Sequence, residues 1–431
     1  MTSLLRRLAV RAPVPVYAVA GLGARAAVQD LRLSGRISMV DTPRAANVLL
    51  AAGSFGGGHA EALARVHDAL PHPRATILWN SDAAGLRIAG ALDLSSASDL
   101  AQGIQQAFTT LVTGARRSEG PLLPDAEPVE WRGIGPYGQG GSGMTGGTPY
   151  GRPLADLGQD RDGLRLDVVP TFLGPFQWPL PPGLVLDLNM AGDLIVDAAV
   201  ASSVMGSPEA MPVPSIFVRA LTESVAVADL EVARARDHLR WTADALLVQG
   251  LPALGLRALA LATRTPPPTG TEVRRLMDRL TRTGVFRWSL PTARDRLRPA
   301  LADAELGPVS RAAGLSADAR LDDPTYRALG FEVILGTSDD AASRWKLRLE
   351  EAARSLELAA RAGAARTDVS GVVETPRGRM AAGDAPTRRS LELLPGLVVG
   401  LAWGDAIASI VSLDLDLGEL ASAGQVAAVV A

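Results

Sequence analysis

Residues 14–31 read VPVYAVAGLGARAAVQDL, an apolar run followed by a glycine turn and an alanine-rich segment with helical spacing. Later in the chain, HAEALARVHDAL at 59–70 places its apolar side chains on one stripe of a helix. Three further short apolar runs have the composition of buried strands: ISMVD at 37–41, NVLLAAG at 47–53 and ATILWN at 75–80. This alternation predicts an α/β domain with a mostly parallel sheet over residues 1–115.

The chain changes character after this domain. Residues 116–163 are rich in glycine and proline, as in GIGPYGQGGSGMTGGTPYGRP, and we expect a linker or an extended arm there. Beyond it, period-two alternation in 164–169 and 183–200 predicts a small antiparallel hairpin. Apolar residues at helical spacing then predict a mainly helical region, so that residues 164–431 form an α+β domain. The helices are expected around 222–263, 271–284, 296–304 and 340–363.

Two features near the C-terminus complete this prediction. The segment DVSGVVETPRGRM at 368–380 is typical of a short β excursion. The apolar stretch 393–413 contains Pro395 and Asp405, and a carboxylate at mid-bilayer is costly, so we expect a buried helix there and not a membrane span. No apolar region of signal-peptide length follows the arginines near the N-terminus, and the cytoplasm is the expected compartment.

Composition excludes several classes of function. The 431 residues include 43 basic and 46 acidic side chains, a net charge of −3, which gives no field to attract nucleic acid. The chain contains no cysteine, which excludes disulfides, thiolate nucleophiles and cysteine-ligated iron–sulfur clusters. We therefore expect no nucleic-acid partner, no metal site and no resident cofactor.

Two local motifs resemble a dinucleotide-binding turn and a nucleophile elbow, but both are common in sequences of this composition. Gly21, Gly23 and Ala26 form a GxGxxA pattern after a strand, with Asp41 further on, as in a dinucleotide-binding turn. A tight strand-to-helix turn explains the same glycines. AGSFG around Ser54 only loosely matches a nucleophile elbow, and a polar turn is the preferred interpretation.

The histidines do not form a convincing metal or catalytic site. His59 and His67 are eight positions apart, which places them about 12 Å apart along a helix, too far to bind one ion. With His72, they are expected to be solvated side chains on and near the helix surface.

The segments TPRAANVLLAAGSF at 42–55 and ALPHPRATILWNSDAAG at 69–85 resemble a known family. It comprises the iron–sulfur subunit at the electron terminus of respiratory complex I and the small subunits of energy-converting nickel–iron hydrogenases. The resemblance implies a four-iron cluster held by an adjacent cysteine pair and two later cysteines. In this chain, Ala24 and Arg25 occupy the positions of the cysteine pair. Asp82 occupies the position of the third cysteine. The resemblance therefore predicts a cluster site without its ligands.

The remainder of the chain resembles the partner large subunit of the same complexes. LGPFQWPLPPGLVLDLNMAGDLIVDAAV at 173–200 is similar to its opening hairpin, with Gln177 at a histidine position. Gly206 lies about where complex I-type members carry a quinone-site histidine. GVVETPRGRM and SIVSLDLDLGEL are similar to two later motifs, the second of which holds nickel-binding cysteines in true hydrogenases. In this chain, the positions of those cysteines are occupied by Asp414, Leu415 and Asp416.

The resemblance implies that the two subunits are fused here and that the cofactor ligands are lost. The chain is then expected to be a redox-inactive structural or coupling subunit of a membrane-bound, complex I-like ion-translocating assembly. It would lie on the inner face of the membrane against antiporter-like or complex I-like membrane subunits. We also predict that Arg25 and Asp82 pair in the former cluster site, because burying either charge alone is costly.

Three alternatives remain open at this point. The former cavity between the two domains could bind a small organic ligand or a quinone, with Arg25, Asp82, Arg161 and Glu374 as its polar groups. The glycine turn at Gly21 and Gly23 could bind NAD. The chain could also act as a chaperone in the assembly of a real hydrogenase.

Overall fold

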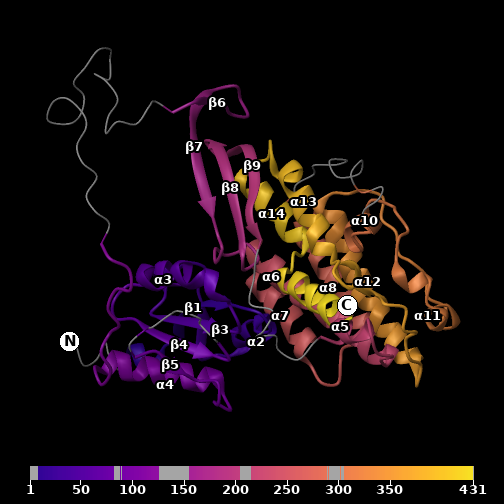
Figure 1. The fold of residues 1–431 in the computed structure, drawn as a ribbon, viewed down its shortest axis with the longest axis horizontal. Coiled ribbons are helices and arrows are strands. Elements are labelled where there is room, and N and C mark those ends of the chain that lie inside the picture. The colour runs from indigo at the N-terminus through magenta and orange to yellow at the C-terminus, as the bar shows by residue number, and fades with distance from the viewer. Residues whose placement is uncertain are drawn as a thin grey trace.

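A computed structural model describes residues 8–81, 88, 90–125, 155–203, 215–288, 290, 301 and 305–430. An α/β unit from the N-terminal part of the chain lies beside a helical part, and an antiparallel sheet rises between them (Figure 1). Asp82, Gly206 and most of the helix expected at 296–304 lie outside the described residues, so what was expected of them stays a prediction.

The first sheet has five parallel strands in the order β2-β1-β3-β4-β5. β1 pairs with β3 from Val16 opposite Val48 to Ala20 opposite Ala52. The parallel α/β architecture predicted for the N-terminal region is therefore confirmed. The strands span Val14–Ala20 (β1), Ile37–Met39 (β2), Val48–Ala52 (β3), Ala75–Trp79 (β4) and Leu92–Asp93 (β5).

The helices of this unit cover both faces of the sheet. They are α2 (Arg25–Asp30), α3 (Ala60–Ala69) and α4 (Leu100–Thr113). Because successive strand residues point to opposite faces, Leu50 packs in one core with Ile104 of α4, while Leu49 shares another with Leu63 of α3. This second core continues into the antiparallel sheet and the C-terminal helices, so the two halves of the chain share one hydrophobic core.

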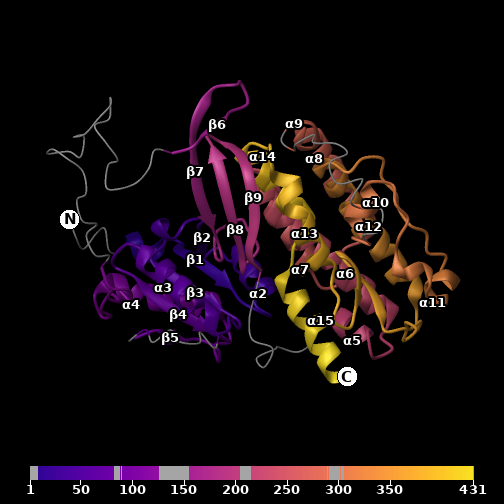
Figure 2. The ribbon, with the colours of Figure 1, turned by 45° about the horizontal axis from the view of Figure 1, so that its top comes forward.

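The second sheet is antiparallel, in the order β6-β7-β8-β9 (Figure 2). Its strands span Leu157–Gln159 (β6), Arg165–Leu173 (β7), Leu184–Ala191 (β8) and Leu194–Ser203 (β9). The predicted hairpin is confirmed as β8–β9 and is extended by β6 and β7. Leu184, Leu186 and Leu188 alternate with more exposed residues and are buried in the shared core.

The rest of the described chain is mainly helical. The long helices α6 and α12 pack against each other, and a short strand pair, β10–β11, follows α12. The bounds are Ile216–Ala220 (α5), Val227–Val248 (α6), Pro252–Thr263 (α7), Gly270–Thr283 (α8), Val285–Trp288 (α9), Pro308–Ala312 (α10), Pro324–Ala328 (α11), Ala341–Ala362 (α12), Val372–Thr375 (β10), Gly378–Ala381 (β11), Pro386–Val398 (α13), Trp403–Leu413 (α14) and Leu417–Val430 (α15).

The expectation of one buried helix over 393–413 is wrong. The stretch contains the end of α13 and the whole of α14, separated by a break at which Gly400 has a φ of 77°. The Gly400 amide donates a 2.7 Å hydrogen bond to the carbonyl of Ile195 in β9. Because this amide is bonded to a strand, it does not donate to a carbonyl within a helix, and the helix is interrupted there. None of the helices in the described part of the chain is long and apolar enough to cross a membrane.

Both ends of the expected linker pack on a sheet where they are described. Glu119 is buried and accepts hydrogen bonds from the amide and hydroxyl of Thr76 in β4, at 2.9 and 2.7 Å. At the other end, β6 pairs with β7. The domain boundaries at residues 115 and 163 stay predictions.

The expectation of solvated histidines is wrong for His59 and His67. Both are buried: His67 lies 2.8 Å from Asp68 and 3.3 Å from Glu119, and Nδ1 of His59 lies 2.8 Å from the carbonyl of Phe55. The segment that contains Glu119 covers His67, and sequence spacing could not reveal this contact. His72 is exposed, as expected. Among the described residues, no group of three or more His, Asp and Glu side chains could hold a metal ion.

Candidate functional site

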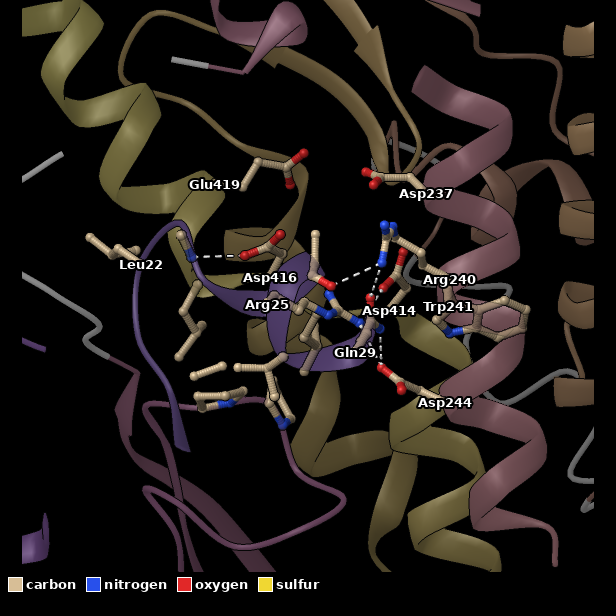
Figure 3. A pocket seen from close by; sticks show the side chains of 18 of the residues that line it. Leu22, Arg25, Gln29, Asp237, Arg240, Trp241, Asp244, Asp414, Asp416 and Glu419 are labelled. Atoms are coloured by element: carbon tan, nitrogen blue, oxygen red, sulfur yellow. Dashed lines mark hydrogen bonds and ion pairs between the residues drawn. The ribbon is translucent and has the colours of Figure 1, made fainter. Parts of the chain in front are cut away.

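A cavity of about 560 Å³ lies where the end of β1 and helix α2 meet α6 and the connection between α14 and α15. Figure 3 shows that charged side chains from these elements converge on it. The cavity thus lies between the N-terminal α/β unit and the helical part. The close-up labels Arg25 and Gln29 from α2, Asp237, Arg240 and Asp244 from α6, and Asp414, Asp416 and Glu419 from the C-terminal segment.

The glycine turn after β1 positions helix α2 at the cavity. A Cβ atom at Gly21 would lie 2.5 Å from the carbonyl oxygen of Ser54, and Gly23 has a φ of 76°. Close packing requires the first glycine, and the left-handed backbone favours the second. The turn ends at Arg25, the first residue of α2, whose side chain lines the cavity.

Arg25 joins the α/β unit to the helical part. Its guanidinium lies 3.5 Å from Asp414 and 3.8 Å from Asp244. The neighbouring Gln29 donates a 2.6 Å hydrogen bond to Asp244. The predicted partner of Arg25, Asp82, lies outside the described residues, whereas Asp414 and Asp244 come from segments more than two hundred positions away.

Asp414 is the buried centre of the charged wall. It ends α14 with a left-handed φ of 56°, and its side chain also lies 3.4 Å from Arg348 of α12. The side chain of Arg377 donates from Nε to the Asp414 carbonyl at 2.9 Å. Three arginines from α2, α12 and the β10–β11 turn therefore contact one aspartate.

Arg377 connects this centre to three further carboxylates. Its guanidinium lies 3.3 Å from Asp416, 3.6 Å from Glu419 and 3.7 Å from Asp237. Burial raises the pKa of Glu419 to about 7, although Arg377 opposes the shift. The charged wall of the cavity therefore includes a carboxyl group that changes protonation near neutral pH.

The rest of the cavity lining is largely apolar and aromatic. The loop between β7 and β8 contributes Phe176, Trp178 and Pro179, and α14 contributes Ile410. The guanidinium of Arg32 lies 5.0 Å from the centre of the Trp178 ring, a cation–π contact. The cavity thus combines an apolar wall with a charged one, which is typical of a binding site for a small organic molecule.

The structure brings together most of the residues predicted from the resemblance. Ala24 and Arg25 lie in and beside the glycine turn, and Arg25 meets Asp414 and Asp416 across the cavity. Gln177 also lines the cavity. Their assignment as former ligand positions stays a prediction.

Two residues expected at this cavity do not line it. Arg161 lies in the β6–β7 turn, where it pairs with Asp193 at 3.2 Å. Glu374 points into a separate buried cluster. They were expected only as possible polar groups of an inter-domain cavity, and sequence alone does not determine the direction of a side chain.

Six charged residues that line the cavity were not expected from the sequence: Arg32, Asp237, Arg240, Asp244, Arg377 and Glu419. Asp237 and Asp244 are seven positions apart on α6, a spacing that places them on one face of the helix. That spacing was a usable signal. Arg377 and Glu419 carry no comparable local pattern, because their roles depend on contacts between distant segments.

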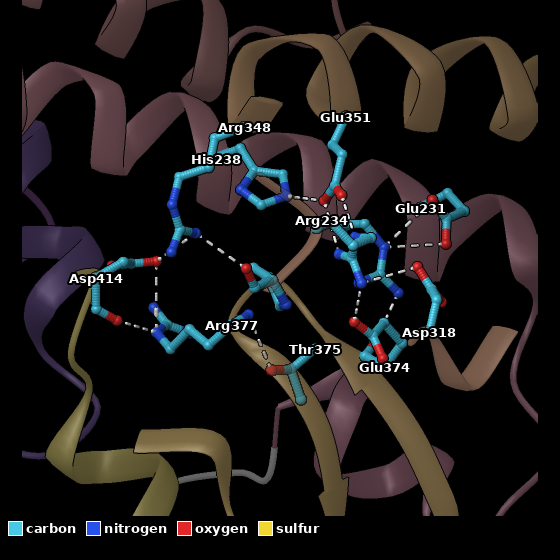
Figure 4. Close-up of polar contacts among 12 residues, drawn as sticks. Glu231, Arg234, His238, Asp318, Arg348, Glu351, Glu374, Thr375, Arg377 and Asp414 are labelled. Atoms are coloured by element: carbon cyan, nitrogen blue, oxygen red, sulfur yellow. Dashed lines mark hydrogen bonds and ion pairs between the residues drawn. The ribbon is translucent and has the colours of Figure 1, made fainter. Parts of the chain in front are cut away.

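A second group of charged side chains is buried behind the cavity (Figure 4). At its centre, Arg311 of α10 lies 2.6 Å from Glu351 and 2.7 Å from Glu374. It also lies 3.0 Å from Asp318. We call this group the buried ion cluster. It comprises Glu231, Arg234, His238, Arg311, Asp318, Arg320, Glu351 and Glu374.

The buried ion cluster and the charged wall are adjacent through β10 and the turn that follows it. Residues 297–381, which include this turn, match a known protein family. Its description is "Respiratory-chain NADH dehydrogenase, 49 Kd subunit". The matched segment is well under half of the chain, and it supplies Arg311, Arg348, Glu351, Glu374 and Arg377. Comparison of the whole chain with curated proteins gives no match.

The residues at the predicted ligand positions do not fit a metal cofactor of the kind the resemblance implies. Iron–sulfur and nickel–iron centres require several thiolates, and Ala24 and Leu415 carry no donor atom. Arg25 brings a positive charge to the site, and Asp414 already contacts three guanidinium groups. No step of a mechanism is therefore assigned to such a centre.

The surroundings of α2 also disfavour the predicted dinucleotide site. The helix has six residues, and Asp414 and Asp416 lie near its first residue, Arg25. Carboxylates at this position repel a pyrophosphate. Asp41, the expected ribose ligand, does not line the cavity, whereas its neighbour Val40 does. The packing role of Gly21 and the backbone conformation of Gly23 account for the motif.

The contact between Arg25 and Asp414 can be measured directly. In a double-mutant cycle with Arg25→Met and Asp414→Asn, we expect a coupling energy of about 1 kcal/mol in the free energy of unfolding. The exposed pair Arg219 and Glu223, 3.2 Å apart, is the control and should give about 0.3 kcal/mol. Equal coupling energies for the two pairs would show that the cavity contact does not hold the halves together.

Proposed function

We propose that this chain is a redox-inactive structural or coupling subunit of a membrane-bound assembly related to complex I or to hydrogenases. The family match and the packing of the two halves of the chain support the proposal, besides the ion pair described below. Residues 297–381 match a family of respiratory-chain NADH dehydrogenase subunits. The N-terminal α/β unit packs against the part of the chain that contains this segment, with a cavity between them.

The observation that carries the proposal is the ion pair between Arg25 and Asp414. By the resemblance, Arg25 replaces a cluster ligand and Asp414 replaces a nickel ligand. In this chain the two side chains lie 3.5 Å apart, joining segments from opposite ends of the sequence. The pair supports a contact that holds the two halves together at a place where relatives transfer electrons.

The proposed loss of redox activity follows from the ligand chemistry. The chain has no cysteine, and a guanidinium group cannot take the place of a thiolate toward iron. A direct test is reconstitution of the purified protein with iron and sulfide under reducing conditions. We expect no visible absorbance from a bound cluster. A stable, stoichiometric cluster would overturn the redox-inactive part of the proposal.

The proposed partners are membrane-embedded antiporter-like or complex I-like subunits, and the proposed place is the inner face of the cell membrane. To test this, the chain is tagged at its native locus and purified from membranes in mild detergent. Mass spectrometry should then find such subunits in stoichiometric amounts. A tagged soluble protein of similar abundance is the control. Recovery of the chain alone from the soluble fraction would contradict the proposal.

A second candidate function rests on the cavity itself. Its volume of about 560 Å³ and its aromatic wall suit a small organic ligand, such as a quinone. A ligand that binds there should raise the midpoint of thermal unfolding. The variant Val248→Trp, which places a large side chain in the cavity wall, should abolish the shift. A shift of equal size in this variant would place the ligand elsewhere.

A further inference from the structure

The buried ion cluster holds more negative than positive groups. Its carboxylates are Glu231, Asp318, Glu351 and Glu374, and its guanidinium groups are Arg234, Arg311 and Arg320. The nearby Arg348 is directed away from it, toward Asp414 and two backbone carbonyls. If all four carboxyl groups are ionised, one negative charge therefore lacks a matching guanidinium within the cluster.

The histidine of the cluster does not supply the missing charge. His238 is fully buried, and its Nε2 lies 3.4 Å from Glu351. Burial lowers the pKa of His238 to about 4, although Glu351 opposes the shift. The imidazole is therefore neutral near pH 7. A proton is the smallest group that can balance the charge.

Three of the four carboxylates have strong partners of their own. Glu231 lies 3.1 Å from Arg234 and accepts a 2.7 Å hydrogen bond from Tyr326. Asp318 lies 2.7 Å from Arg320, and Glu351 lies 2.6 Å from Arg311. Burial opposes ionisation of these groups, but the arginines outweigh it and hold their pKa values below the usual range.

Glu374 is the carboxyl group left with a shared partner. Its ion-pair partner is Arg311, at 2.7 Å. Arg311 also forms ion pairs with Glu351 and Asp318. Its second oxygen accepts from the amide of Ala319 at 3.0 Å. Burial and the charge of Asp318 raise the pKa of Glu374 to about 7, against the attraction of Arg311 and Arg320.

Charged groups near Glu374 come from several elements, while Arg379, its cross-strand neighbour on β11, is exposed and pairs with Glu305 at 2.9 Å. Helix α10 contributes Arg311, and the turn at 318–320 contributes Asp318 and Arg320. Helix α6 contributes Arg234, which donates to the backbone carbonyl of Glu374 at 2.7 Å. Glu351 of α12 faces it through Arg311. The charged groups closest to Glu374 thus include three arginines and two carboxylates.

A small recess of about 20 Å³ lies on the far side of this cluster. Glu231, Arg320 and Glu351 line the recess together with Arg354, whose side chain is half exposed. Glu374 does not line the recess, but Arg311 joins it to Glu351, which does. On the other side, the turn from Glu374 to Arg377 leads directly to the charged wall.

We propose that the buried ion cluster is a binding site for one exchangeable proton, held at Glu374 and exchanged with solvent on the side of the recess. The site belongs to the chain itself and does not depend on the membrane assembly proposed above. Within such an assembly, the β10–β11 turn would connect the proton site to the cavity. Uptake of a proton at Glu374 would then change the net charge of the cluster next to Arg377.

The test is an infrared titration of the full-length protein from about pH 5 to about pH 9. A protonated carboxyl group has a carbonyl band that is absent from the carboxylate. We expect the wild type to lose two such bands with midpoints near pH 7, one from Glu374 and one from Glu419 of the cavity. Glu374→Gln should remove one band and Glu419→Gln the other. Glu392→Gln, at an exposed position on α13, is the control and should remove neither.

A second variant tests the assignment without removing Glu374. The charge of Asp318 favours the protonated form of Glu374, so Asp318→Asn should move the midpoint of the Glu374 band to lower pH. The Glu419 band should stay in place. A spectrum in which Glu374→Gln removes no titrating band, or in which Asp318→Asn leaves the midpoint unchanged, would overturn the proposal.

Discussion

Replacement of Arg311 by methionine is expected to lower the free energy of unfolding by about 3–5 kcal/mol. Arg311 is fully buried and lies within 3.0 Å of three carboxylates, those of Glu351, Glu374 and Asp318. Methionine fills a similar volume but leaves these charges without their common partner. The loss should therefore come mostly from uncompensated buried charge. Urea unfolding at pH 7 measures it directly.

Arg274→Met is a matched control for this variant. Arg274 also contacts two glutamates, Glu350 at 3.0 Å and Glu357, but its side chain is about one-third exposed. Solvent screens these contacts, so the expected loss is at most about 1 kcal/mol. Similar losses for the two variants would mean that burial does not control the energy of the cluster. Combining Arg311→Met with Glu351→Gln should recover part of the stability, because the buried charge of Glu351 that has lost its partner is then removed.

The second large effect is expected for Gly378→Ala, with a loss of about 3–5 kcal/mol in the free energy of unfolding. Gly378 has a φ of 140°, and an added Cβ would lie 2.6 Å from the carbonyl oxygen of Glu305 and 2.7 Å from the amide nitrogen of Gly307. The contacted atoms belong to the backbone and cannot move as a side chain can. The variant should therefore separate β11 from the segment that leads into α10.

Gly371→Ala is the control for a positive φ without the close contact, although its left-handed backbone is less restricted to glycine than that of Gly378. Gly371 has a φ of 73°, and an added Cβ would have no other atom within 4 Å beyond its chain neighbours. Its expected cost is that of the left-handed backbone, about 1–2 kcal/mol. Denaturant unfolding of both variants, with the wild type as reference, measures both losses. The difference between them reports the cost of the close contact beyond that of the backbone conformation. Equal losses would contradict the close packing between Gly378 and Gly307.

Much of the fold could be predicted from local pattern. Short apolar runs separated by helical stretches were sufficient for the parallel sheet from β1 to β4, since buried strands and amphipathic helices differ in their periodicity. The pairing of β8 and β9 followed from alternation around the AGD turn. The break between α13 and α14 was missed, because the hydrogen bond from Gly400 to Ile195 joins distant segments.

The candidate site was predicted in part. The resemblance singled out Arg25, Asp414 and Asp416, and the structure places them at one cavity. It did not reveal Arg377 or Asp237, and the pairing expected for Arg25 involved a residue outside the described chain. The burial of His67, too, depends on Glu119, which contacts α3 from the segment expected as a linker.

The sequence by itself determined the absence of thiolate chemistry, the small net charge and the alternation that builds the two sheets, because composition and periodicity are properties of the chain alone. Only the tertiary structure decided which charges share a site. Arg25 and Asp414 are 389 positions apart, and Arg311 reaches three carboxylates on separate elements. The energy of such ion pairs depends on distance and burial, and both exist only once the chain has folded.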